Sequence, residues 1–352
     1  SLDMRLAPSL PLVDDINTVL EWYSDSLLHD TRSWLIRTLQ NANNDRKNRS
    51  NLPWDVELIG DKMVSFLPET LRFQLNVYTE ICSVHLTSDT NDEADNKAAA
   101  VLDTGTGISL GMSMPSGMQI HPTVPVAYAL SQAAITDRVN EMILHALTEA
   151  LVLLAEEYVR ALQGRHWDRP DPTTGKLTVH RDFLAAIAND CHRVLTVHLP
   201  EIQETVHTSN TYFNQKKAVL VQAFGEPADI ALRQILRIVF TDVQSTLIEF
   251  DSLWQNPKNL ATRTICVAVS SHLRSLQNIL CADLFFKLLG SVAQVIVLRM
   301  LLFLKNRSSV KGPLSTDDIT RFLRDVAQVK QCFINFMSDA DSIGFNLDSG
   351  SI

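Results

Sequence analysis

Histidine is one of the residue types through which this chain could bind a metal or move a proton. The sequence has ten histidines, and none of them stands in a His-Glu-x-x-His motif. His192 and His198 are six positions apart, which places them on different faces of a helix. We therefore interpret the histidines as structural residues and predict that the chain binds no metal.

Cysteine and serine offer no clearer nucleophile. The five cysteines are odd in number, widely spaced and set in apolar stretches: Cys82, Cys191, Cys266, Cys281 and Cys332. That distribution differs from a disulfide framework or a Cys-x-x-Cys metal site and is typical of a protein in a reducing cytosol. No Gly-x-Ser-x-Gly motif is present. We predict no enzymatic activity, no cofactor, and no catalytic, cofactor-binding or metal-binding residue. An unfamiliar enzyme stays an alternative, because catalytic triads assemble from residues far apart in sequence.

One glycine-rich segment resembles a phosphate-binding loop only superficially. Residues 105–111 read Gly-Thr-Gly-Ile-Ser-Leu-Gly, but no strand pattern precedes them and no Gly-Lys-Ser/Thr follows. They lie within residues 88–123, where an acidic run is followed by several glycines and prolines. We predict an acidic, glycine-rich flexible loop rather than a nucleotide site.

The composition indicates that helices must position whatever functional residues the chain has. Of its 352 residues 45% are hydrophobic, and only 12 Gly and 13 Pro interrupt them, which favours long elements over tight turns. The net charge of -9 comes without any dense basic block, so we predict that nucleic acid is not a partner.

Apolar residues recur at helical spacing along most of the chain. We expect helices over about residues 14–41, 53–86, 124–164, 177–207, 228–254, 260–279, 280–305 and 315–337. A kink or break is expected at Pro68 and near Pro200, and residues 210–224 form a shorter segment that ends before Pro227. Gly164 and Ser315 are expected to cap helix ends. No strand pattern is evident, and residues 265–269, although β-branched, favour helix because helical segments flank them.

Residues 284–304 are apolar enough to be tested as a membrane span. Lys287, Gln294 and Arg299 interrupt them within the length that a bilayer core requires. We interpret this segment as a buried helix.

The succession of helices predicts an all-α fold, an elongated rod of stacked antiparallel helical bundles. We expect an N-terminal helical bundle portion at 1–87, the flexible loop at 88–123, a middle bundle at 124–224 and a C-terminal bundle at 225–352.

Four segments, in order, resemble the Sec-six subunit of the exocyst, the complex that tethers secretory vesicles at the plasma membrane. Residues 30–39, Asp-Thr-Arg-Ser-Trp-Leu-Ile-Arg-Thr-Leu, resemble the family's Ser-Trp-Leu-Arg helix. Residues 183–191, Phe-Leu-Ala-Ala-Ile-Ala-Asn-Asp-Cys, resemble the family's apolar run with paired asparagines and a cysteine. Together the four segments cover most of residues 14–336.

The third and fourth segments lie toward the C-terminus. Trp254 precedes residues 264–269, Thr-Ile-Cys-Val-Ala-Val, much as in the family, although residues 270–272, Ser-Ser-His, depart from its acidic residue, aspartate and tyrosine. Residues 292–304 resemble a valine-rich family helix with a central Leu-Arg pair. The helix after it matches through Leu323, Asp325, Phe333 and Phe336.

The resemblance implies a non-catalytic tethering subunit that acts through protein contacts. Its expected partners are other exocyst subunits and SNARE and SNARE-regulating proteins, with peripheral plasma-membrane association through those partners; a homodimer is a further expected assembly. The implied location is the cytoplasm, at plasma-membrane sites of secretion. A subunit of another tethering or priming complex, or a helical repeat adaptor unrelated to trafficking, stays an alternative.

Overall fold

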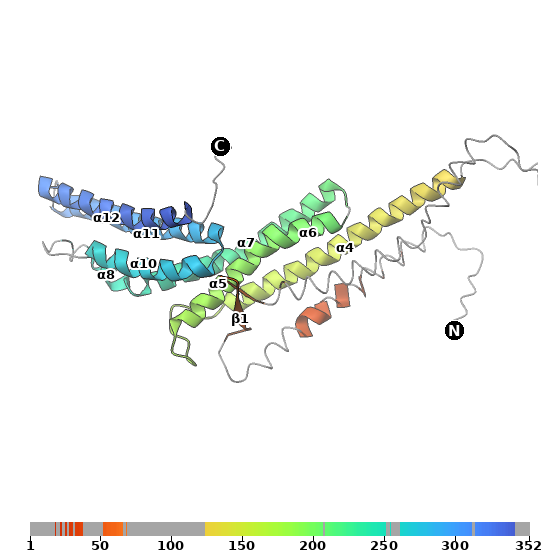
Figure 1. Ribbon diagram of the computed structural model, residues 1–352, viewed down its shortest axis with the longest axis horizontal. Helices are drawn as coiled ribbons and strands as arrows, with labels where there is room; N and C mark the ends of the chain where they lie inside the picture. The colour runs from red at the N-terminus through yellow and green to blue at the C-terminus, as the bar shows by residue number, and fades with distance from the viewer. Residues whose placement is uncertain are drawn as a thin grey trace, which may run out of the picture. The chain divides into compact units, whose positions relative to one another are not determined.

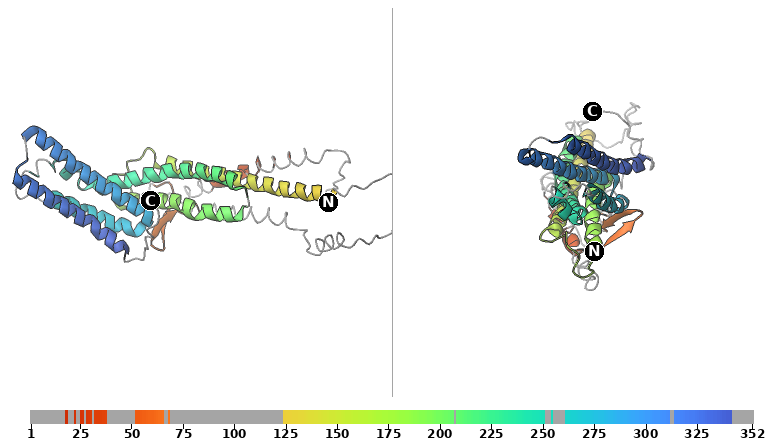
Figure 2. Two further views of the ribbon diagram at one scale, coloured as in Figure 1. Left: turned by 90° about the horizontal axis from the view of Figure 1, so that it is seen from above. Right: turned by 90° about the vertical axis from the view of Figure 1, so that its left-hand side faces the viewer.

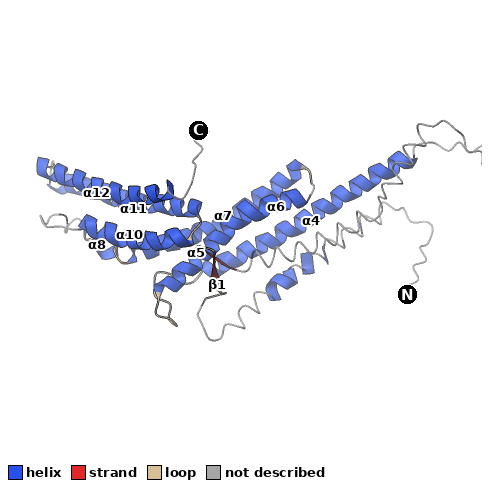
Figure 3. Ribbon diagram, in the orientation of Figure 1, coloured by secondary structure: helices blue, strands red, loops and turns tan. Residues whose placement is uncertain are grey.

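The computed structural model describes residues 52–65, 68, 124–206, 208–250, 254, 261–311 and 314–341, and also 18, 22, 25, 26, 28–30 and 32–37. Within these residues helices predominate, and the strands are two short ones (Figure 3). The expected all-α fold class is therefore confirmed. The rod shape and the domain boundaries stay predictions, and the loop predicted at 88–123 lies outside the described residues.

The elements are labelled in Figure 1. In chain order they are β1 (Val56–Ile59), β2 (Lys62–Ser65), α4 (Val124–Leu162), α5 (Leu177–Arg193), the π-helix η1 (Val194–His198), α6 (Leu199–Thr205), α7 (Asn210–Thr241), α8 (Gln244–Ile248), α10 (Ala261–Ile279), α11 (Ala282–Lys311) and α12 (Thr316–Asp341). The described residues belong to two compact units. Unit 1 draws on Ser1–Ile36, Leu67–Leu153 and Val197–Leu220, and unit 2 draws on Arg37–Phe66, Leu154–Thr196 and Val221–Ile352.

Unit 1 is held by a buried face of α4. Leu144, Leu147 and Leu151 are buried at helical spacing, and Phe213 of α7 is buried in the same unit. The Lys216 ammonium lies 3.0 Å from His145 Nδ1, which joins the beginning of α7 to α4.

The first part of unit 2 is built on an aromatic core. Trp54 lies 5.6 Å from Tyr158 and 5.3 Å from Phe183, measured between ring centroids. Phe183 also stacks on Trp167, and Tyr158 meets Phe224 edge to face. All five rings are buried, so segments far apart in the sequence share one hydrophobic cluster.

Trp254 is the centre of the C-terminal helices of unit 2, drawn in blue tones in Figure 2. Its ring lies 4.7 Å from Phe303, and its indole N–H donates to Asp325 at 2.7 Å. The guanidinium groups of Arg307 and Arg321 lie over the ring at 5.4 and 4.6 Å. Trp254 therefore ties α11 to α12.

Two further contacts fix the direction of α12 against α11. Phe285 lies near Phe336, and Arg307 donates to Asp318 at 2.6 Å. The beginning of α11 thus meets the end of α12, and the two helices run antiparallel.

The predicted helix caps are confirmed. The Ser315 hydroxyl accepts from the Asp318 backbone N–H at 3.1 Å, as expected of an N-cap residue before α12. Gly164 has a φ of 71°, the left-handed conformation that ends many helices, two residues after α4. The interruption near Pro200 is also confirmed, because η1 separates α5 from α6.

The helix predicted from residue 53 is wrong at its start, because residues 56–65 form a β-hairpin. β1 and β2 pair antiparallel with Ile59 opposite Lys62, which leaves a two-residue turn. Gly60 occupies that turn with a φ of 65°, a conformation that glycine adopts without strain. Val64 and Ser65 are buried against α5, so contacts with a distant helix stabilise the strand.

The break predicted before residue 228 is also wrong. α7 runs from 210 to 241 through Gly225 and Pro227, although these residues cost a helix about 1 and about 3 kcal/mol. Phe224, Ala231 and Ile235 lie on one face and are fully buried, and this packing offsets the cost. The helix ends at Thr241 rather than continuing to 254.

The apolar helix expected at 280–305 is present as α11, but it is buried on one face only. Its span Ala282–Arg307 is long and apolar enough to cross a membrane. Within the span, 33% of the 18-residue window that meets this test is buried. Lys287 pairs with Asp229 at 2.7 Å, and Arg299 donates to the carbonyls of Leu247 and Ile248 at the end of α8. The charges that interrupt the span therefore bind neighbouring parts of unit 2.

Candidate functional site

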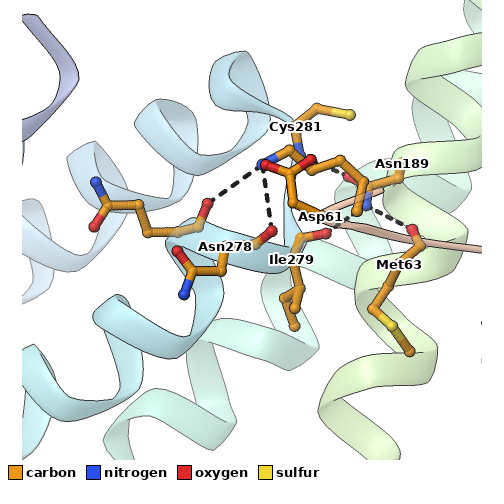
Figure 4. Close-up of polar contacts among 8 residues, drawn as sticks. Asp61, Met63, Asn189, Asn278, Ile279 and Cys281 are labelled. Carbon is orange, nitrogen blue, oxygen red and sulfur yellow. Dashed lines mark hydrogen bonds and ion pairs between the residues drawn. The ribbon is translucent and has the colours of Figure 1, made fainter. Parts of the chain in front are cut away.

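Asn189 of α5 is the centre of a buried polar cluster in unit 2 (Figure 4). Its side-chain amide donates to the carbonyls of Met63 and Ile279, both at 2.7 Å, and its oxygen accepts from the backbone N–H of Cys281 at 2.8 Å. Ile279 is the last residue of α10, and Cys281 directly precedes α11. The Asn189 side chain thus supplies hydrogen-bond partners to backbone groups of β2 and of the junction between α10 and α11.

Lys62 extends this cluster from the hairpin. Its ammonium donates to the carbonyls of Asn278 at 3.3 Å and Gln277 at 3.5 Å, and it forms an ion pair with Asp61 at 3.3 Å. These carbonyls belong to the last turn of α10, where a positive charge is favourable. We call Lys62, Asn189 and Asp190 the polar node.

Asp190, the next residue of α5, holds the hairpin through a second set of bonds. Its carboxylate accepts from the backbone N–H of Ser65 at 3.1 Å, from the Ser65 hydroxyl and from the Tyr158 hydroxyl at 3.1 Å. Burial raises the pKa of Asp190 to about 7, although the bonds from Ser65 and Tyr158 and the charge of Arg193 act in the opposite direction. Burial and the Asp190 charge raise the pKa of Tyr158, so its hydroxyl keeps its proton.

We predict that the contribution of Asp190 to the free energy of unfolding falls as the pH rises from about 4 to about 7. The folded chain holds the Asp190 proton more tightly than the unfolded chain, so this contribution is complete below the ordinary pKa of 3.8 and is lost as the pH passes about 7. At 1.36 kcal/mol for each pKa unit, the loss is at most about 4 kcal/mol. Urea unfolding at a series of pH values measures it.

Asp190→Asn should remove this part of the pH dependence, because an amide does not titrate. Asp182→Asn on the same helix is the matched control, since Asp182 is only half-buried and pairs with Arg181. If the free energy of unfolding changed with pH equally in Asp190→Asn and in the unaltered chain, Asp190 would not be the group responsible.

Four of the histidines that the structure describes lie in separate places. His145 is near Lys216 and Glu149, and His192 is 3.6 Å from Asp283. His198 is 3.3 Å from Glu201, and His180 meets the ring of Trp167 edge to face. Among the residues that the structure describes, no three His, Cys, Asp or Glu side chains are grouped as metal ligands.

Unit 1 contains an open hollow of about 500 Å³ beside α4 and the beginning of α7. It is lined by Asp137, Glu141, Gln203, Val206, Thr208, Ser209, Asn210 and Phe213. Of its two carboxylates, Glu141 pairs with Arg138 at 3.4 Å.

α11 and α12 also carry a surface of exposed large apolar side chains. On α11 these are Val297, Leu298, Leu301 and Leu302, each about half exposed, and on α12 they are Ile319, Leu323, Val326, Ile334 and Met337. We call the five residues on α12 the apolar surface.

The apolar surface follows a helical stripe. Positions 319, 323, 326, 334 and 337 are separated by three, four or eight residues, so they lie along one side of the helix. Lys330, which is exposed, falls within the same stripe. The buried residues Val329 and Phe336 lie on another side, against the rest of unit 2. A stripe of this kind is typical of a surface that packs against another helix.

Sequence reasoning named no site residue and missed both features. The signal for the polar node was present, because Asn189 and Asp190 interrupt an otherwise apolar run at 183–191. Polar residues inside such a run must be buried with partners. The apolar surface gave no equivalent signal, since exposed and buried leucines look alike in a sequence.

Comparison with known proteins finds a family model and a solved structure to which this chain is similar. A family model described as "Exocyst complex component Sec6" matches residues 119–347, which is more than half of the chain. A similar solved structure is the crystal structure of the C-terminal domain of the exocyst subunit Sec6p, at 14% identity and a TM-score of 0.53. The match covers 93% of this chain and 72% of that one. No curated protein sequence matches.

Proposed function

Because the chain belongs to the exocyst Sec6 family, we propose that it is a non-catalytic subunit of the exocyst that docks secretory vesicles at the plasma membrane through protein contacts. The apolar surface is the observation that supports this proposal best. Five large apolar side chains along one side of α12 stay exposed to water, which favours a surface that another protein covers.

We propose that the occupant of the apolar surface is an amphipathic helix of another exocyst subunit. The α12 stripe has the spacing that fits the ridges of a second helix. Lys330 adds a positive charge within the stripe, so the partner helix should carry an acidic residue opposite it. The hydrophobic contacts supply affinity, and the charge sets the register.

Leu323→Glu with Val326→Glu should weaken binding to that subunit at least tenfold. The two carboxylates would have to be buried in the interface, and about 1.4 kcal/mol is enough for a factor of ten. The tagged chain is recovered from a lysate of its own cells, the co-purifying exocyst subunits are identified by mass spectrometry, and the affinity for the recovered subunit is then measured with purified proteins.

Thr320→Glu with Gln331→Glu is the matched control, because it adds the same charges to exposed positions of α12 away from the stripe. Both double variants should keep the thermal stability of the unaltered chain. Equal recovery of exocyst subunits with the two double variants would contradict the proposed docking site. Recovery of none by the unaltered chain would contradict the proposed function itself.

The remaining features of this function follow from membership in the complex. We propose that the chain lies in the cytoplasm at sites of secretion, that it reaches the plasma membrane through its partners, and that SNARE and SNARE-regulating proteins are among them. Two other outcomes would reassign the apolar surface. A dimer in sedimentation that Leu323→Glu disrupts would assign it to a second copy, and flotation with lipid vesicles that the same change abolishes would assign it to a membrane.

A further inference from the structure

Cys266 of α10 and Cys332 of α12 form a pair of thiols in unit 2. The Cys332 thiol donates to the Cys266 backbone carbonyl at a sulfur-to-oxygen distance of 3.8 Å, so the two cysteines meet where α12 packs against α10. Both cysteines are free. Because the Cys332 sulfur already contacts the backbone of Cys266, rotation of the two side chains and a small approach of the helices would bring the sulfur atoms to the S–S distance of about 2.05 Å.

The two thiols differ in their surroundings. Cys266 is buried, whereas Cys332 is partly accessible to solvent. Ser270 Oγ lies 3.1 Å from the Cys332 sulfur. The charged groups near the pair are Arg274 on α10 and Asp325 on α12. Access and hydrogen-bond donors therefore favour Cys332 as the thiol that reacts first.

The protonation of the pair agrees with this order. Interaction with the Cys266 thiol lowers the pKa of Cys332 to about 6, and Ser270 and Arg274 act in the same direction while burial opposes them. The same interaction, together with burial, raises the pKa of Cys266. Burial also raises the pKa of Cys191 and of Cys281. Among the four described cysteines, Cys332 is thus the one whose pKa is lowered.

We propose that Cys332 and Cys266 are a redox modification site, in which a hydroperoxide oxidises Cys332 and Cys266 resolves the product to an intramolecular disulfide. In the first step the Cys332 thiolate attacks a peroxide oxygen, the O–O bond breaks, and Cys332 becomes a sulfenic acid. In the second step Cys266 loses its proton and attacks the Cys332 sulfur. The S–S bond forms, the S–O bond breaks, and hydroxide leaves with the proton as water. Two thiols and one hydrogen peroxide give one disulfide and two waters.

The disulfide would join α10 covalently to α12, two helices that are in contact although α11 separates them in the sequence. The two cysteines are 66 residues apart, so the bond closes a long loop and restricts the unfolded chain strongly. Oxidation would then fix the position of α12 against α10.

The test uses the purified full chain and one equivalent of hydrogen peroxide. Intact mass should fall by two hydrogen atoms, and peptide mapping should give a Cys266–Cys332 cross-linked peptide. The melting temperature should rise by roughly 5 °C or more and return on reduction with dithiothreitol. Before oxidation, iodoacetamide at pH 7 should label Cys332 at least about ten times faster than Cys281, because far more of Cys332 is thiolate.

Single variants separate the two roles. Cys266→Ala should stop at a Cys332 sulfenic acid that dimedone traps, and Cys332→Ala should give neither the adduct at that position nor the disulfide. Cys281→Ala, which alters the other half-buried thiol, should leave the disulfide unchanged. Faster alkylation of Cys281 than of Cys332, or peroxide treatment of the unaltered chain that gives no cross-linked peptide, would overturn the proposal without any variant having to fold.

Discussion

Asn189→Ala is expected to lower the free energy of unfolding by about 4 kcal/mol, since it leaves the Met63 and Ile279 carbonyls and the Cys281 N–H without their partner. Each buried backbone group that loses its hydrogen bond costs roughly 1–3 kcal/mol. The same change also opens a cavity at a site that is only 1% exposed. Urea unfolding followed by circular dichroism measures the loss.

Asn278→Ala is the matched control for this prediction. Asn278 lies in the last turn of α10 and is exposed, and it contributes its backbone carbonyl rather than its side chain to the polar node. Its substitution should change the free energy of unfolding by less than about 0.5 kcal/mol. A cost for Asn189→Ala as small as that of the control would show that water replaces the lost hydrogen bonds.

Trp254→Ala should destabilise the chain by a similar amount, about 3–5 kcal/mol. The substitution removes the contact with Phe303, the hydrogen bond to Asp325 and the aromatic face beneath Arg307 and Arg321. Since these residues belong to α11 and α12, the loss should separate the two helices. Thermal unfolding and amide hydrogen exchange of α12 measure the two effects.

Trp254→Phe divides the contribution of packing from that of the hydrogen bond. Phenylalanine keeps the contact with Phe303 but has no N–H for Asp325, so about 1–2 kcal/mol of the loss should remain. Trp22→Ala, at a position that is 71% exposed, is the control for loss of a tryptophan from the surface. Unchanged protection of the α12 amides from hydrogen exchange in Trp254→Ala would contradict the proposed role of this ring.

The helices that sequence reasoning predicted correctly are those in which local and distant interactions agree. α12 begins after Ser315 because a hydroxyl at the N-cap and carboxylates in the first turn favour a helix there. Three of residues 265–269 in α10 are β-branched, yet the segment is helical. The reason is that the apolar face of α10, with Ile265, Val269 and Leu273, is buried in one stripe.

The errors arose where distant contacts decide the local structure. Val56, Ile59 and Met63 are spaced as in a helix, and the strand pairing became visible only through the turn at Gly60 and the bonds from Ser65 to Asp190. α7 continues through Pro227 because of buried neighbours that no sequence window contains. The reactivity of Cys332 likewise depends on Cys266 and Ser270, which lie on another helix.

The polar node also sets the order in which unit 2 becomes complete on the ribosome. The hydrogen bond from Ser65 to Asp190 can form only after 125 more residues have been synthesised. The bond from Cys281 to Asn189 needs a further 92 residues. At roughly 5–20 residues per second, the hairpin emerges on the order of 10 s before its partners exist. A two-stranded sheet is marginally stable alone, so it has to persist unpaired or be protected during that interval. The segment that is synthesised first is therefore among the last parts of unit 2 to fold.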